Sequence, residues 1–438
     1  MAGIFKAYDI RGIYGDTLTD DIAYHIGRAF VTFLQCRKVV VGRDMRAHSE
    51  AVYAALSRGL TDQGADVIDI GLSSTPMCYF ANGKLGADAS LMITASHNPG
   101  EWNGFKLCRA DAVPISGATG IADIEALVES GQFEAPASKG KIESYDIAGE
   151  YKAHIAKHAN INGSLKIAVD FANAMGIVEH KAIEGLFEQV DLFGELDGNF
   201  PNHEANPLNL ETLHDVQRSV VDNGCDFGIA YDGDADRVGF VDEKGDVVPM
   251  DFITALIAKT MLQSKTGNVL YDLRSSNAVA ELISENGGTP IKSRVGHAFI
   301  KQQMREHKAI FAGELSGHYY FEENYCAESA ALAVIFIANL VSQTKQTLSA
   351  LIKPIQRYAA SGEINSKVGD TDAVFARLRE TYPEAQFEEL DGLTVILTDW
   401  WFNVRSSNTE PLVRLNLEAG DTAMMEAKRD EVLDIIRA

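Results

Sequence analysis

Cysteine is scarce and scattered in this sequence. No two cysteines form a C-x-x-C pair, and their number is odd; they are Cys36, Cys78, Cys108, Cys225 and Cys326. This pattern argues against a disulfide framework and against a zinc site built from cysteine pairs. Free thiols in a reducing compartment are the simpler interpretation, and they favour a cytoplasmic protein.

Long apolar runs are also missing. No stretch approaches the roughly 18 consecutive apolar residues that a membrane-spanning helix needs. Residues 1–6 lack the apolar core of a secretory signal. The sequence therefore predicts neither membrane insertion nor export.

Basic residues are outnumbered. The chain has 39 Lys and Arg against 62 Asp and Glu, which gives a formal net charge of −23. Such an excess repels nucleic-acid backbones and anionic membrane surfaces, so neither is expected as a partner. A phosphate ester as substrate would require a local cluster of Arg and Lys to reverse the field.

Two phosphate-binding signatures are absent as well. The sequence contains neither G-x-x-x-x-G-K-[ST] nor G-x-G-x-x-G, which argues against an ATP kinase and against a dinucleotide enzyme. What remains is a composition of 46% hydrophobic and 23% charged residues, ordinary for a folded protein. A chain of 438 residues is too long for one core and predicts three or four domains.

Short apolar runs alternate with longer amphipathic segments, which is typical of α/β layers. Helices are expected at 49–63 and 422–437, and strands at 38–41, 65–70, 89–93, 166–169, 227–230, 269–273, 289–291, 309–312, 393–397 and 412–417. A linker is expected at 131–145 and a hairpin turn at 242–245. The predicted domains are 1–143, 144–246, 247–358 and 359–438.

A hydroxyl nucleophile follows one of these apolar runs. Ser96 lies in Thr94-Ala95-Ser96-His97-Asn98-Pro99, three residues past the run 89–93. Ligands of open α/β sheets collect beyond the carboxyl ends of strands, so the hydroxyl is expected at such an edge. An ordinary polar turn is the alternative. A serine hydrolase is disfavoured because adjacent Ser96 and His97 are poorly placed for a nucleophile–base hydrogen bond, and the G-x-S-x-G elbow is missing.

Three aspartates alternate in Asp232-Gly233-Asp234-Ala235-Asp236-Arg237. Their carboxylates can converge on one hard cation, and Mg²⁺ prefers carboxylate and phosphate oxygens. A calcium loop is the sharpest alternative, because Glu243 completes the EF-hand spacing. It is disfavoured because Arg237 stands where that loop needs glycine, and because 227–230 and 238–241 look like strands. A surface acidic loop without function is the other alternative.

Candidate donors for a phosphate and a sugar stand elsewhere. Lys106 follows Ser96 by ten residues, so a hairpin could return its amine to the serine as an acid or base, although a lone lysine is usually a surface charge.

The run 405–411 combines a guanidinium, hydroxyls and turn-forming N–H groups, which suit a phosphate as well as a plain polar turn. The run 313–318 places Glu and Ser between glycines, where they can meet sugar hydroxyls. Further candidates are Lys6, Tyr8, Arg11, Arg274 and His297.

Taken in order, these motifs resemble those of the α-D-phosphohexomutases, most closely the bacterial phosphomannomutase/phosphoglucomutase branch. The likeness spans the chain through six motifs: Tyr8-Asp9-Ile10-Arg11-Gly12, 94–99, 103–106, 232–237, 313–318 and 405–411. The resemblance implies an α/β protein with three similar mixed α/β domains and a smaller C-terminal α+β domain around a central cleft.

The resemblance also implies a role for each motif. Ser96 would be the phosphorylated serine, and its phosphate would join Asp232, Asp234 and Asp236 as ligands of Mg²⁺. Lys106 would be the general acid/base, with His97, Arg237 and Arg11 near the transferring group. The implied substrate contacts are Arg405, Ser407, Asn408 and Thr409 for the non-reacting phosphate, Glu314 and Ser316 for the sugar hydroxyls, and, more loosely, Lys6, Tyr8, Arg274 and His297.

The activity that the resemblance implies interconverts hexose 1-phosphates and 6-phosphates. Phosphoserine would phosphorylate the free hydroxyl, the hexose 1,6-bisphosphate would turn in the cleft, and the other phosphate would return to Ser96. Leu315 stands where the manno/gluco branch of the family usually has an apolar Met and the glucosamine branch tends to have Gln, and Phe105 also fits the former. The resemblance therefore implies mannose and glucose rather than glucosamine as the sugar. The alternatives are a phosphoglucosamine mutase, a phosphoserine-dependent sugar phosphatase and a non-catalytic sugar-phosphate-binding protein.

Overall fold

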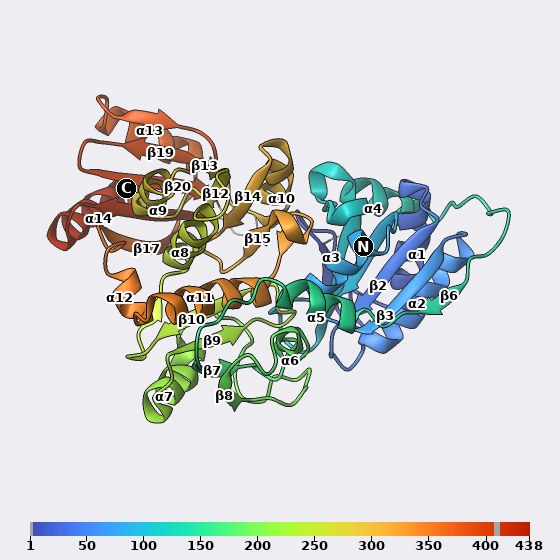
Figure 1. Ribbon diagram of the computed structural model, residues 1–438. Helices are drawn as coiled ribbons and strands as arrows, with labels where there is room; N and C mark the ends of the chain where they lie inside the picture. Colours follow the sequence, from blue (N-terminus) through green and yellow to red (C-terminus); the bar gives the residue numbers. More distant parts are fainter. Residues whose placement is uncertain (1–2, 407–411) are drawn as a thin grey trace.

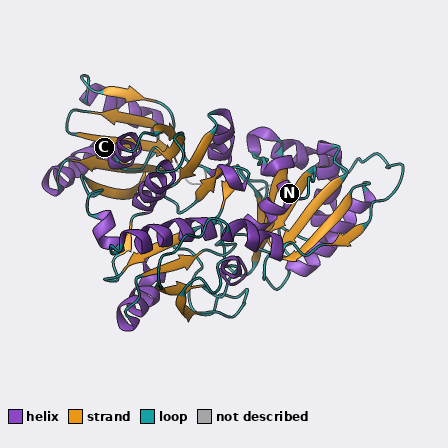
Figure 2. Ribbon diagram, in the orientation of Figure 1, coloured by secondary structure: helices purple, strands orange, loops and turns teal. Residues whose placement is uncertain are grey.

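Four β-sheets follow one another along the chain in the computed structural model, which describes residues 3–406 and 412–438 (Figure 1). The first three sheets mix parallel and antiparallel strands, and the fourth is antiparallel throughout (Figure 2). The three similar α/β domains and the C-terminal α+β domain predicted from the sequence are thus confirmed. Among the described residues, no helix combines the length and the apolarity that crossing a bilayer requires.

The first sheet has the strand order β1-β5-β4-β2-β3-β6. Val39 and Val41 of β2 pack under α1, α2 and α4, whereas Val40 packs with α3 on the other face, because successive side chains of a strand point to opposite sides. The elements are β1 (Ile10–Ile13), α1 (Asp20–Leu34), β2 (Lys38–Arg43), α2 (Ser49–Asp62), β3 (Asp66–Leu72), α3 (Thr75–Lys84), β4 (Ala89–Ile93), β5 (Trp102–Arg109), α4 (Ile121–Ser130) and β6 (Ile142–Ser144).

The second and third sheets have the orders β11-β10-β9-β7-β8 and β13-β12-β14-β15-β16. The second domain consists of α5 (Ala148–Ala156), β7 (Lys166–Asp170), α6 (Gly176–Glu179), β8 (Glu188–Leu192), α7 (His214–Asn223), β9 (Phe227–Tyr231), β10 (Val238–Asp242) and β11 (Val247–Val248). The third consists of α8 (Met250–Leu262), β12 (Asn268–Asp272), α9 (Asn277–Glu285), β13 (Thr289–Ser293), α10 (His297–Glu306), β14 (Ala309–Gly313), β15 (Tyr319–Phe321), β16 (Ala327–Glu328), α11 (Ala330–Thr344) and α12 (Leu348–Ile352).

The fourth sheet has the order β17-β21-β20-β19-β18. Its elements are β17 (Ala359–Lys367), α13 (Thr371–Thr381), β18 (Gln386–Glu388), β19 (Leu393–Ile396), β20 (Trp400–Ser406), β21 (Leu412–Ala419) and α14 (Thr422–Arg437). The strands and helices expected from the sequence are confirmed, with small shifts at their ends. The expected linker 131–145 needs a correction, because β6 lies inside it and pairs in parallel with β3.

One strand scheme recurs in the first three sheets. In each, a parallel strand leads through a loop into an antiparallel partner: β4 into β5, β9 into β10, and β14 into β15. All three leading strands are completely buried, which explains their apolar sequences. The loops after them, at the carboxyl edge of each sheet, carry the three central sequence motifs.

The largest apolar cluster joins the first three domains. It contains Val40 of the first sheet, Val169 of the second and Val269 of the third. Helix α11 contributes many of its members and runs beneath the third sheet towards the first domain (Figure 1). The fourth domain has an apolar cluster of its own. The shared core explains how loops from separate sheets are held together.

Candidate active site

The three equivalent loops meet at one place. The backbone of the β9–β10 loop touches the serine loop so closely that a Cβ on Gly233 would lie 2.0 Å from the carbonyl oxygen of Ser96. Only glycine permits this approach. The β9–β10 loop also contacts the loop that follows β14. Arg237 forms a β-bridge with His318, and the N–H of Val238 donates to the carbonyl of Gly317. The second domain therefore supplies the centre of the site, and the first and third domains flank it.

The serine loop has a strained backbone that a buried arginine supports. Ser96 has φ of 52°, a left-handed conformation that is unfavourable for a side-chain-bearing residue. The guanidinium of Arg46 donates to the carbonyls of Ser96 at 2.9 Å, Asn98 at 2.6 Å and Pro99 at 2.6 Å. It also pairs with Asp44 at 3.1 Å. Burial lowers the pKa of Arg46, and Asp44 opposes that shift.

The hydroxyl of Ser96 faces the aspartate loop. It donates to Oδ2 of Asp232 at 3.1 Å and accepts from Nη2 of Arg237 at 3.2 Å. Arg237 also donates from Nε to the same oxygen of Asp232 at 2.9 Å. Ser96 itself is 3% exposed. A group attached to this oxygen would lie between a carboxylate and a guanidinium.

The expectation for His97 requires a correction. Its Nδ1 lies 3.3 Å from Oγ of Ser96, so the adjacent side chains do come within hydrogen-bond reach. The left-handed backbone at Ser96 turns the two side chains towards each other. The same nitrogen also contacts Nη2 of Arg237. Burial, together with Arg237 and Arg11, lowers the pKa of His97 to about 2, which makes this imidazole a weak base.

The three aspartates converge. One oxygen each of Asp232, Asp234 and Asp236 lies within 4.8 Å of the others, and all three side chains are buried. Within the described residues, Oδ1 of Asp234 has no hydrogen-bond partner, and Oδ1 of Asp236 has no nearer donor than Nε2 of His318 at 3.3 Å. Buried carboxylate oxygens without donors are costly, and a metal ion would supply what they lack. The loop therefore fits a metal ion.

Lys106 reaches the same carboxylates from β5. Its ammonium lies 2.6 Å from Oδ2 of Asp234 and also contacts Oδ2 of Asp236. Although burial opposes the charge, Asp234 and Asp236 raise the pKa of Lys106. The hairpin of β4 and β5 brings Lys106 opposite Met92, close to the start of the serine loop. The amine is therefore held as an ammonium beside two aspartates of the loop whose third aspartate, Asp232, contacts Ser96.

The third loop adds a charged triad. His318 has Nε2 at 3.3 Å from Oδ1 of Asp236 and Nδ1 at 3.3 Å from Oε2 of Glu314. Although burial opposes it, these two carboxylates raise the pKa of His318 to about 9. Ser316 contacts Nδ1 of the same ring at 2.8 Å. Glu314 accepts from the hydroxyl of Tyr320 at 2.6 Å, and its pKa is lowered to about 2 because His318 outweighs burial.

A second group of possible metal ligands lies beside the first. It consists of Asp236, His318 and Glu328. Glu328 pairs with Lys301 at 2.8 Å, and both side chains are completely buried. His318 carries the raised pKa described above. These charges already balance one another, so we interpret this group as an ion-pair network.

The three N-terminal candidates, Arg11, Tyr8 and Lys6, have different surroundings. Arg11 donates to Oδ1 of Asn98 at 2.6 Å and to Oδ2 of Asp9 at 2.8 Å, so it belongs to the serine loop. The ring of Tyr8 lies 5.6 Å from that of His297, with the two planes tilted by 59°. Lys6 is exposed ahead of β1, and no hydrogen bond joins its ammonium to another described residue.

Two further arginines come from the third and fourth domains. Arg274 donates to Oδ2 of Asp272 at 2.7 Å and lies 3.8 Å from Oε2 of Glu363. Arg405 pairs with the same oxygen of Glu363. The other residues expected in that phosphate loop lie outside the described residues; they are Ser407, Asn408 and Thr409.

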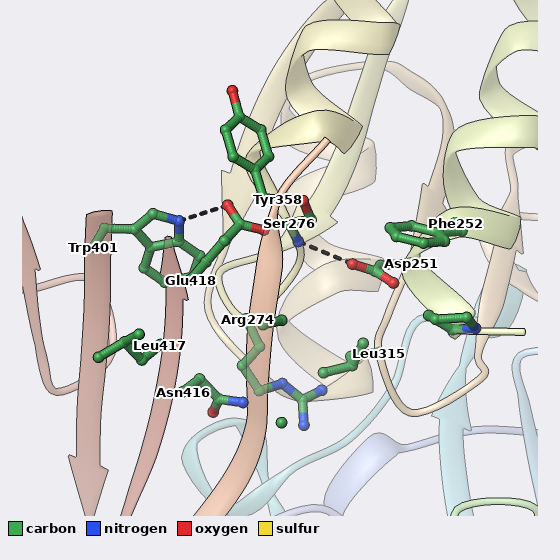
Figure 3. Close-up of a pocket in the computed structure, with 13 residues that line it drawn as sticks. Asp251, Phe252, Arg274, Ser276, Leu315, Tyr358, Trp401, Asn416, Leu417 and Glu418 are labelled. Atoms are coloured by element: carbon green, nitrogen blue, oxygen red, sulfur yellow. Dashed lines mark hydrogen bonds between the residues drawn. The ribbon is translucent and has the colours of Figure 1, made fainter. Parts of the chain in front are cut away.

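A cavity of about 280 Å³ separates these two domains (Figure 3). The side chains of Arg274 and Leu315 line it from the third domain, and Trp401 and Glu418 line it from the fourth. Glu418 accepts from Nε1 of Trp401 at 2.9 Å and from the N–H of Asn277 at 3.0 Å. The cavity thus lies between Leu315 of the loop 313–318 and the contact of Glu418 with α9.

Family models account for the four units. Three, described as phosphoglucomutase/phosphomannomutase alpha/beta/alpha domains I, II and III, match residues 2–135, 149–245 and 249–358. A fourth, described as the C-terminal domain, matches residues 363–435. The chain belongs to the phosphoglucomutase/phosphomannomutase family.

Relatives in this family match the chain along its whole length. A protein named phosphomannomutase from Escherichia coli is 40% identical over 450 residues and covers 99% of each chain. One of the same name from Methanocaldococcus jannaschii is 42% identical, with 99% of this chain and 97% of the relative covered. The crystal structure of a phosphoglucomutase/phosphomannomutase family protein from Burkholderia thailandensis has a TM-score of 0.91 and 32% identity, covering 99% of this chain and 96% of that one.

Sequence reasoning missed several residues of this family member's site. Arg46 holds the serine loop, and Thr75 donates to Asp234, yet neither stands in a motif. His318 stands at the end of the motif 313–318, where only Glu314 and Ser316 were singled out. The sequence could have indicated His318, because it lies two residues after Ser316 in a motif that had already been recognised. For Arg46 and Thr75 only the fold brings the partners together.

Proposed function

We propose that this protein is a phosphohexomutase that interconverts the 1-phosphates and 6-phosphates of mannose and glucose. The reaction runs through phosphorylated Ser96 and a hexose 1,6-bisphosphate. The observation that carries the proposal is the hydroxyl of Ser96, buried between Asp232 and Arg237 in a chain with all four family domains. The cation is Mg²⁺, which prefers the carboxylate oxygens that this loop offers.

In the first half-reaction, the free hydroxyl of the bound hexose phosphate attacks the phosphorus on Ser96. The bond from phosphorus to the sugar oxygen forms, and the bond to Oγ of Ser96 breaks. Lys106 gives a proton to the departing serine oxygen and recovers one from the attacking hydroxyl. Its resting ammonium form, favoured by Asp234 and Asp236, suits the first of these steps. The second half-reaction reverses the bonds with the other phosphate of the bisphosphate.

The other residues hold and orient the reactants. Arg237 donates to Oγ of Ser96 and thereby offers a guanidinium to the transferring group. Asp232, Asp234 and Asp236 would hold Mg²⁺, which when bound neutralises negative charge on the transferring phosphoryl group. Glu314 and Ser316 are assigned to the sugar hydroxyls. Arg405 and Arg274, which share Glu363, are assigned to the phosphate that does not react.

The first test replaces Ser96 by Ala and follows conversion of mannose 1-phosphate to the 6-phosphate in a coupled assay. We expect a loss of roughly a thousandfold or more in kcat, because the nucleophile is gone. Ser90→Ala is the matched control, since Ser90 is a buried serine of β4, the strand that leads into the loop of Ser96, and it accepts from Asn82. Chelation with EDTA should abolish turnover of the natural sequence, and added Mg²⁺ should restore it. Undiminished isomerisation by the Ser96 variant would refute the mechanism.

Two measurements separate the alternatives. A phosphatase would release inorganic phosphate from mannose 1-phosphate, whereas a mutase conserves it. Comparison of kcat/KM on mannose, glucose and glucosamine 1-phosphates identifies the sugar. We expect the first two to exceed the third, because Leu315 offers no polar side chain to an amino group. A preference for glucosamine 1-phosphate would instead identify a phosphoglucosamine mutase.

A further inference from the structure

Thr75 links the first domain to the aspartate loop of the second. It is the first residue of α3 and is completely buried. Its hydroxyl donates to Oδ2 of Asp234 at 2.5 Å, and its backbone N–H donates to the carbonyl of the same aspartate at 3.0 Å. Two hydrogen bonds therefore fix both the backbone and the side chain of Asp234 from a segment 159 residues away.

These contacts distinguish the two oxygens of Asp234. Oδ2 receives the hydroxyl of Thr75 and lies 2.6 Å from the ammonium of Lys106. Oδ1 is buried and has no hydrogen-bond partner among the described residues. With donors on one oxygen only, the plane of the carboxylate is fixed. The free oxygen is then the one available to a cation beside Asp232 and Asp236.

The hydroxyl of Thr75 is not needed to begin the helix. Ser74 already caps α3, because its side chain accepts from the N–H of Met77 at 3.2 Å. A threonine at the first helical position has no intrinsic advantage over valine or serine that would explain a hydroxyl directed at another domain. Its partner is a carboxylate, which makes the hydrogen bond stronger than one between neutral groups.

We propose that Thr75 is a positioning residue for the cation site: its hydroxyl orients Asp234 so that Oδ1 faces the cation. This inference rests on the proposed function, in which the three aspartates hold Mg²⁺. Hydrogen bonds to metal-binding side chains set the orientation of those side chains, and their loss commonly lowers metal affinity by about 10–100-fold. The role assigned to Thr75 is exerted through Asp234, the residue that its hydroxyl contacts.

The test compares Thr75→Val, which keeps the shape of the side chain, with Thr75→Ser, which keeps the hydroxyl. Calorimetric titration of the full-length protein with MgCl₂ should show affinity about 10–100-fold weaker for the valine variant and nearly unchanged affinity for the serine variant. Thr212→Val is the control, because Thr212 is also buried but donates only to the carbonyls of Asn206 and Asn209.

Kinetics supply an independent readout. Thr75→Val should raise the Mg²⁺ concentration needed for half-maximal rate, and saturating Mg²⁺ should restore most of kcat. A purely structural defect would lower kcat at every Mg²⁺ concentration and would overturn the inference. If the valine variant does not fold, Thr75→Ala is titrated in its place.

The outcomes also separate this inference from the proposed function. If the natural sequence itself binds no Mg²⁺, the proposed function fails. If the natural sequence binds Mg²⁺ and the variants without the hydroxyl bind it equally well, the role of Thr75 alone is refuted. Weak binding by the valine variant with rescue by the serine variant supports both.

Discussion

Charged side chains next to Ser96 are almost entirely buried, and each has an opposite charge beside it. Arg46 pairs with Asp44, Lys106 with Asp234, and Arg237 with Asp232. Removing one partner of a buried pair costs about 3–5 kcal/mol, because the other charge is left without compensation. Each of these charges therefore depends on its partner, and changing one of them also affects the stability of the fold. Substitutions that test catalysis here need thermal unfolding measurements beside the rates.

Arg405 offers a residue-scale prediction about substrate binding. Replacing Arg405 by Ala should raise KM for mannose 1-phosphate by an amount worth about 2–5 kcal/mol, because the bound phosphate loses a guanidinium and Glu363 loses one of its arginine partners. The change in kcat should be much smaller, since Arg405 is assigned to the phosphate that does not react. Steady-state kinetics measure both parameters.

Arg379→Ala is a suitable control for that substitution, because Arg379 also pairs with a glutamate of the fourth domain, Glu389, but lies on α13. A large fall in kcat with unchanged KM would contradict the assignment of Arg405.

At the scale of elements, three helices meet at one buried carboxyl group. Glu179, the last residue of α6, accepts from the hydroxyl of Ser74 at 2.5 Å and from that of Tyr151 at 2.7 Å. It also accepts from the N–H of Ala331, in the first turn of α11, at 3.2 Å. One side chain thus joins elements of the first three domains. This contact ties the start of α3, helix α5, the end of α6 and the start of α11 to one another.

The titration of Glu179 predicts a pH dependence of stability. Burial raises the pKa of Glu179 to about 7, despite the hydrogen bonds from Ser74 and Tyr151. Between the ordinary pKa of 4.5 and this value the unfolded chain releases a proton that the folded chain keeps. The contribution of Glu179 to the free energy of unfolding is therefore fully present below pH 4.5. It decreases by about 1.4 kcal/mol per pH unit between pH 4.5 and pH 7.

Glu179→Gln removes that titration. The difference in melting temperature between the natural sequence and this variant, measured from pH 5 to 8, should shift in favour of the variant as the pH rises. Glu184→Gln, an exposed residue of the same domain, should show no such trend. A constant difference across the range would show that Glu179 ionises normally in the folded protein.

The elements also show which sequence signals are informative. The completely buried strands β4, β9 and β14 are mostly apolar, with Ser90 as a polar exception in β4, so their runs identify them without tertiary information. Strand β6 was missed because all three of its residues are exposed at the edge of the sheet. An edge strand without a buried face has no hydrophobic pattern, and its existence depends on its pairing with β3.

At the scale of the whole molecule, the contact between the third and fourth domains positions residues of the site. Glu418 of β21 accepts from the first N–H of α9 and from Trp401. Burial raises the pKa of this side chain, and the hydrogen bonds from Asn277, at the N-terminus of α9, and from Trp401 oppose that shift. The same two domains supply Arg274 and Arg405, which share Glu363. The position of the fourth domain therefore determines the spacing of the two arginines.

We predict that Glu418→Ala raises KM for mannose 1-phosphate about fivefold or more while kcat changes little, because loss of the acceptor leaves two donors unpaired at a cost of about 1–3 kcal/mol. Steady-state kinetics with thermal unfolding measure this effect. Glu426→Ala on the exposed face of α14 is the control and should leave KM unchanged. An unchanged KM for the Glu418 variant would mean that the arginines are spaced by other contacts.

The sequence by itself determined the layered α/β class, the motifs and their order, and the net charge of −23. Those features are local, since apolar runs specify buried strands and the alternating aspartates specify their own loop. Only the tertiary structure decided that Ser96 lies against Asp232, that His97 turns towards Ser96, and that Thr75 and Arg46 support the loops. These contacts join segments that are distant in the chain or depend on one left-handed backbone, and close packing of three sheets around a common core brings them together.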